Sequence, residues 1–91
     1  MFALKPFEFQ TKHHPYAYVA RQVGLVRLMS EHPGLTKIEA LEWEFSKAFQ
    51  WCWEQFGTNT FLAKDWHVDR DNRRLYFTNE AYALAFKLRW C

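Results

Sequence analysis

The chain has 91 residues, of which 49% are hydrophobic and 20% aromatic, and its formal net charge is only +2. This length predicts one domain spanning residues 1–91, and the composition excludes disordered and low-complexity classes. No apolar run approaches the roughly 18 residues of a membrane span, and residues 1–11 lack the pattern of a secretory signal. The sequence therefore predicts a cytoplasmic protein that does not enter a membrane.

The first third of the chain predicts a strand followed by a helix. Residues 7–10 alternate aromatic and polar side chains, which indicates a short strand that starts near Pro6 and lies at a sheet edge. Residues 13–15 form a break. Residues 16–31 carry apolar side chains at helical spacing on two sides, and residues 32–34 end this predicted helix.

A second helix is predicted over residues 37–56. Thr36 and Glu39 have the spacing of a capping box, and Gly57 is well placed to end the helix. Its predicted core face is one stripe, made of Ile38, Leu41, Phe45, Phe49, Cys52 and Phe56. Trp43 and Trp51 fall off that stripe, so they either pack beneath the first helix or stand exposed.

The last third predicts a hairpin, a short helix and a strand. Residues 66–68 alternate, residues 69–72 are typical of a turn, and Leu75 and Phe77 point inward on the returning strand. Thr78 is the expected cap of a helix that ends near Phe86, and residues 87–90 predict a final strand. The predicted fold is α+β, a small antiparallel sheet packed on two helices, with a ferredoxin-like arrangement plus one extra helix as its candidate topology.

The residue types that commonly perform catalysis or bind metals form no recognisable pattern in this sequence. The histidines and cysteines have no metal-binding spacing, and no nucleophile, phosphate-loop or dinucleotide motif occurs. We therefore predict no catalytic residues, no cofactor and no metal, and hence no enzyme. Two reduced thiols are expected at Cys52 and Cys91, with a single disulfide between them as the alternative.

Aromatic residues are the most unusual feature of the composition. The chain contains nine Phe, five Trp and four Tyr, each of which buries about 150–250 Å² when it packs in a core. A chain this short has little room for all of them, and exposed Trp and Tyr anchor protein interfaces. The predicted partner-binding residues are Tyr16, Tyr18, Trp43, Trp51 and Trp53. Self-association belongs to the same hypothesis, and the alternative is that these side chains seal the helices together.

A second hypothesis is a module that binds single-stranded nucleic acid or a nucleotide. The predicted open sheet face combines an aromatic ring with basic groups, as single-strand readers do. Its members are His67, Arg74, Tyr76, Lys87 and Arg89. The alternative is an ordinary solvated sheet face.

The closing segment resembles the end of small proteins from tailed bacteriophages, which finish in a strand, a short helix and an FKLxW-like strand. The matching residues are Phe77, Asn79, Glu80, Ala83, Phe86, Lys87, Leu88 and Trp90. The resemblance covers less than a third of the chain. It implies a phage accessory protein that modulates or inhibits a host protein in the bacterial cytoplasm. A minor virion component is the third hypothesis.

Overall fold

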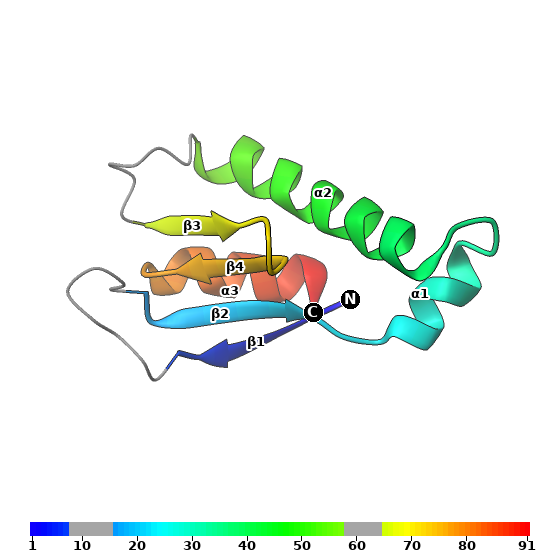
Figure 1. The fold of residues 1–91 in the computed structure, drawn as a ribbon. Helices are drawn as coiled ribbons and strands as arrows, with labels where there is room; N and C mark the ends of the chain where they lie inside the picture. The colour runs from blue at the N-terminus through cyan, green and yellow to red at the C-terminus, as the bar shows by residue number, and fades with distance from the viewer. Residues whose placement is uncertain (8–15, 58–64) are drawn as a thin grey trace.

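The computed structural model describes residues 1–7, 16–57 and 65–91. Along the chain its elements are β1 (Phe2–Pro6), β2 (Tyr18–Gln22), α1 (Leu25–Glu31), α2 (Lys37–Phe56), β3 (Trp66–Asp69), β4 (Arg74–Phe77) and α3 (Glu80–Trp90). The strands form one antiparallel sheet in the order β1-β2-β4-β3. Helix α3 lies behind the sheet in the view of Figure 1, and no helix lies in front of it. The predicted α+β class is confirmed.

The order of the elements differs from the ferredoxin-like candidate. That fold alternates strands and helices as β-α-β-β-α-β, whereas here β1 and β2 pair directly and two helices follow before β3. Strand β1 lies at a sheet edge, as predicted, but Pro6 ends it rather than starting it. The predicted strand residues 8–10 and the predicted break at 13–15 lie outside the described residues.

Strand register sends one row of side chains into the core. Ala20 lies opposite Leu4 on one side and Leu75 on the other, and Phe77 lies opposite Trp66. This row packs against Phe45, Ala48 and Cys52 of α2 and against Ala83 and Phe86 of α3. Both helices therefore cover the same sheet face, and the inward orientation predicted for Leu75 and Phe77 is confirmed.

Phe86 lies at the centre of an aromatic cluster. Its ring centroid lies 5.3 Å from that of Phe2 and 5.2 Å from that of Phe77, which come from strands at opposite ends of the chain. Trp51 of α2 lies 6.2 Å away on another side. Edge-to-face contacts of this kind add to the free energy of burying the rings. One side chain thus joins β1, β4, α2 and α3.

The predicted helix over residues 16–31 is wrong in its first half. Residues 18–22 form β2, which pairs with β1 and β4, and only residues 25–31 are helical. Aromatic and β-branched side chains at Tyr18 and Val19 suit a central strand, where packing overrides a helical pattern. Gly24 then takes φ of +72°, a left-handed conformation that glycine adopts easily, and α1 begins after it.

The predicted final strand at residues 87–90 is also wrong. Those residues continue α3 to Trp90, so the short helix is one turn longer than expected. Asn79, not Thr78, is the N-cap, and its side chain accepts from the backbone N–H groups of Ala81 and Tyr82. Four alternating residues carry too little periodicity to separate a strand from a last helical turn.

Helix α2 matches its predicted limits, but its core face is rotated. The capping box is present: the Thr36 hydroxyl accepts from the Glu39 N–H, and the Glu39 carboxylate accepts from the Thr36 N–H. Ile38 was expected in the core and is 57% exposed. The buried residues of the helix are Ala40, Glu44, Phe45, Ala48 and Cys52.

The central position of Phe86 predicts a large loss of stability on truncation. Phe86→Ala should lower the free energy of unfolding by about 3–5 kcal/mol, because it leaves a cavity where four elements meet. Leu88→Ala is the matched control on the same helix, since Leu88 is 81% exposed, and it should change stability by less than about 0.5 kcal/mol. Urea unfolding followed by far-UV circular dichroism measures both. Equal losses for the two variants would contradict this description of the core.

Candidate functional site

The five predicted partner-binding aromatics do not form one surface. Trp43 and Trp53 stand on the outer side of α2, with 46% and 45% of their surface exposed. Trp51 instead packs against the core, with its ring centroid 5.5 Å from Phe56 and 6.2 Å from Phe86. Trp51 is therefore not one of the exposed aromatic residues, because its ring packs against the core.

The two tyrosines lie away from α2. Tyr18 is on β2 and packs against the edge of the core beside Leu4. Tyr16 precedes β2 and stacks on His67 with 5.5 Å between ring centroids. Neither tyrosine shares a pocket with Trp43, so the aromatic surplus is divided among the core, the sheet and the outside of α2.

A pocket of about 410 Å³ lies beside Trp43. Its walls come from α1, from α2 and from both ends of the chain, which meet at one end of the sheet (Figure 1). Trp43 is held at the rim by His32, whose ring centroid is 4.3 Å away, and by the Lys47 ammonium at 5.8 Å. These contacts fix the orientation of the indole ring and leave nearly half of it accessible.

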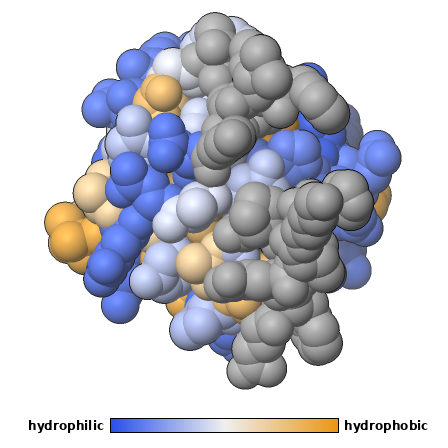
Figure 2. All heavy atoms as spheres, turned by 90° about the vertical axis from the view of Figure 1, so that its left-hand side faces the viewer, coloured by the Kyte–Doolittle hydropathy of each residue, from blue (hydrophilic) through white to orange (hydrophobic). Residues whose placement is uncertain are grey.

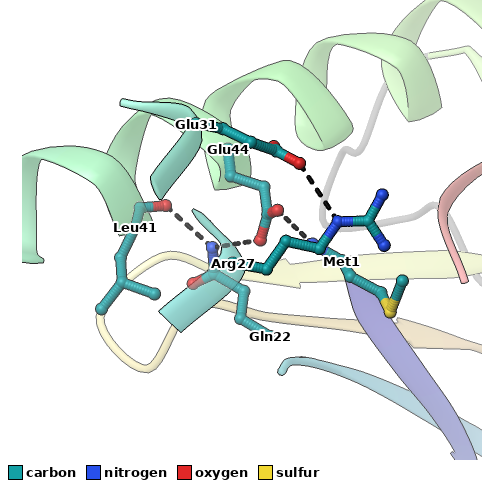
Figure 3. Close-up of polar contacts among 6 residues, drawn as sticks. All are labelled: Met1, Gln22, Arg27, Glu31, Leu41 and Glu44. Carbon is teal, nitrogen blue, oxygen red and sulfur yellow. Dashed lines mark hydrogen bonds and ion pairs between the residues drawn. The ribbon is translucent and has the colours of Figure 1, made fainter. Parts of the chain in front are cut away.

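The floor of this pocket is a buried carboxylate. Glu44 is 7% exposed and accepts from the Gln22 amide at 3.1 Å and from the terminal amine of Met1 (Figure 3). The same Gln22 amide donates to the carbonyl of Leu41 at 2.9 Å. A buried carboxylate is tolerated only when charged or polar partners satisfy it. This network joins β1, β2 and α2 directly beneath Trp43.

Two exposed hydrophobic side chains line this pocket. Met1 and Trp43 are 45% and 46% exposed. We call these two residues, together with the pocket, the Trp43 surface. Figure 2 shows the other end of the molecule, where the described residues in view are mainly hydrophilic and hydrophobic ones form separate small groups.

The charges at the rim of the Trp43 surface are unequal. Arg27 forms an ion pair with Glu31 at 3.2 Å, so this pair is neutral overall. Arg89 also lines the pocket and lies over the Trp90 ring at 5.1 Å. Within the part of the chain that the structure describes, no carboxylate lies within ion-pair distance of Arg89. The rim therefore has a net positive group next to apolar surface.

The sheet face opposite α2 and α3 holds only part of the predicted nucleic-acid set. Register places His67, Arg74 and Tyr76 on this face, as expected, together with Arg21. Tyr76 is only 5% exposed and packs with Phe7 at 5.4 Å, so its ring is not open to a base. Burial of this ring removes the stacking surface on which that hypothesis depended.

Lys87 and Arg89 were expected on the same sheet face, and this expectation is wrong. Both lie in the last turn of α3, behind the sheet, because residues 87–90 are helical. Basic side chains there interact favourably with the carbonyl end of the helix. The interaction with the helix end explains their position, and neither residue contributes a positive charge to the sheet face.

Neither cysteine is arranged as a catalytic nucleophile. Cys52 is fully buried, and burial raises the pKa of its thiol to about 12. Cys91 is exposed, and both residues are free thiols. Among the described residues no group of three or more His, Cys, Asp or Glu side chains is placed to hold a metal ion.

Comparison of the chain with protein-family models, with curated proteins and with solved structures found no match. The helices in the described ranges include none that combines the length and apolar character needed to cross a membrane.

The two thiols should differ sharply in reactivity. At about pH 8 the Cys52 thiol stays protonated because its pKa is raised, and the thiolate is the reactive form. Iodoacetamide should therefore modify Cys91 alone in the native protein and both residues in denaturant, as measured by peptide mass spectrometry. Modification of Cys52 at the rate of Cys91 in the native protein would contradict the buried position of Cys52.

Proposed function

We propose that this protein is a binding module that engages a protein partner through the Trp43 surface. The observation that supports it is an exposed tryptophan that lines one pocket together with the exposed side chain of Met1. Interface hot spots are typically tryptophans next to pockets that receive a side chain of the partner. The two-sided support of Trp43 by His32 and Lys47 presents the ring in a fixed orientation, which lowers the entropy lost on binding.

The chemistry of the pocket defines the partner. Leu28 and Trp90 form the apolar part of a lining that also includes charged side chains, and an apolar side chain of the partner would pack on that part. Arg89 at the rim favours a carboxylate next to that apolar anchor, because opposite charges across an interface select the partner and its register. We therefore propose a partner segment that carries an apolar anchor beside an acidic residue. A bacterial host protein as partner, or a role in a virion, is supported by the phage resemblance alone.

Selection of short peptides from a random display library tests this proposal. Peptides selected by the wild-type protein should share an apolar residue next to an acidic one. Trp43→Ala should bind them at least about tenfold more weakly, the loss expected of a central interface tryptophan.

Trp53→Ala is the matched control, because Trp53 is equally exposed on the same helix and does not line the pocket. It should bind the selected peptides as the wild type does, and far-UV circular dichroism confirms that both variants are folded. Equal binding by Trp43→Ala and the wild type would contradict the proposal. A light-scattering mass well above 11.1 kDa that Trp43→Ala reduces would instead identify a second copy as the occupant.

Single-stranded nucleic acid, bound through its phosphates on the sheet face opposite α2 and α3, is the second candidate. One observation favours it: Arg21 and Arg74 are side by side on a face that no helix covers in Figure 1. If it binds nucleic acid, the purified protein should carry a raised absorbance at 260 nm that high salt removes, because phosphate binding releases counterions. A protein-only spectrum at low salt would contradict this candidate, and the Trp43 surface would be unaffected.

A further inference from the structure

We propose that Arg21, Arg73 and Arg74 bind a phosphate group of a small molecule in a pocket at the end of the sheet. The inference is independent of the Trp43 surface, which uses a different pocket. It rests on the register of β2 and β4, on the local supply of carboxylates, and on the shape of the pocket that the three side chains line.

Strand register brings two positive charges together. Arg21 of β2 and Arg74 of β4 are direct Cα partners, so their side chains leave the same sheet face next to each other. Like charges directly opposite in an antiparallel pair are destabilising. An anion placed between the two guanidinium groups would attract both of them and offset their repulsion.

The carboxylates near these arginines are fewer than the arginines. Glu42 of α2 pairs with Arg73 at 3.2 Å. Asp69 lies opposite Arg74 in register, and its oxygens accept from the backbone N–H and the side-chain amide of Asn72 in the hairpin turn. Within residues 1–7, 16–57 and 65–91, no carboxylate lies within ion-pair distance of Arg21 or Arg74. Three arginines against Glu42 and Asp69 leave a net positive charge at the pocket, and Arg21 is the arginine with neither an ion pair nor a carboxylate opposite it in register.

The pocket has the size and the donors that a phosphate group requires. Its volume is about 310 Å³, and its walls include the three arginines and Asn72. Arg73 is a turn residue with φ of +53° that lines the pocket. Its ion pair with Glu42 anchors its side chain to α2. Guanidinium groups donate paired hydrogen bonds that match the oxygens of a phosphate.

The remaining walls favour a small molecule over a polymer. Leu25 of α1 and Leu41 of α2 also line the pocket, so one side chain of each helix contributes to it beside the sheet residues. Lys5, the basic residue of β1, lies on the same sheet face but does not line this pocket. A single phosphate group with a short apolar or neutral attachment fits these walls.

Titration with inorganic phosphate and pyrophosphate, followed by amide and guanidinium NMR signals, tests the site, with chloride at equal ionic strength as the control. We expect saturable shifts at Asn72 and at the three arginines. Arg21→Gln and Arg74→Gln should each weaken phosphate binding by about tenfold, the effect of losing one charged hydrogen-bond donor. Lys5→Gln is the matched control for charge loss on the same face, and it should bind phosphate as the wild type does.

Thermal unfolding supplies a second readout that a purely structural role would not give. Without phosphate, Arg21→Gln should melt at a slightly higher temperature than the wild type, because the repulsion with Arg74 is gone. With phosphate, the wild type should gain stability through binding and Arg21→Gln should not. Shifts no larger than those in chloride, or an equal loss of binding in Lys5→Gln, would overturn the proposal.

Discussion

The need to bury one face of a four-stranded sheet beneath two helices determines most of this structure. Helices α2 and α3 both pack on that face, and Phe86 contacts strands from opposite ends of the chain as well as Trp51 of α2. Large aromatic rings supply the buried area that so short a chain needs. Because α2 turns Phe45, Ala48 and Cys52 toward the sheet, Trp43 and Trp53 are left on its outer side.

The buried carboxylate of Glu44 connects this core to the candidate binding surface. It is held by Gln22 of β2 and by the amine of Met1, so the end of the sheet is fixed to the middle of α2 (Figure 3). Trp43 is the neighbouring residue on that helix and lines the same pocket as Glu44. The Trp43 surface and the arginine pocket share no lining residue.

Local signals allowed parts of this fold to be predicted from sequence. The capping box at Thr36 and Glu39 and the hairpin turn are determined by neighbouring residues; the capping box is confirmed, and the turn lies at residues 70–73, one position later than predicted. Residues 18–22 were misassigned because strand pairing, which no local pattern reports, overrides their helical spacing. The burial of Glu44 and the placement of Arg21 opposite Arg74 in strand register depend on contacts between distant segments. The residues of the candidate sites were therefore only partly predictable from sequence. Tyr76 shows the same limit: its face was predicted, but its burial was not.

The tryptophans divide between the core and an exposed surface. Fluorine NMR of protein labelled with 5-fluorotryptophan measures this division when a soluble paramagnetic quencher is added and each signal is assigned by single substitution. We expect strong broadening of the Trp43 and Trp53 signals, little effect on Trp66, which is 1% exposed, and intermediate effects on Trp51 and Trp90. A Trp43 signal as well protected as that of Trp66 would show that this ring is a core residue, and it would contradict the proposed binding surface.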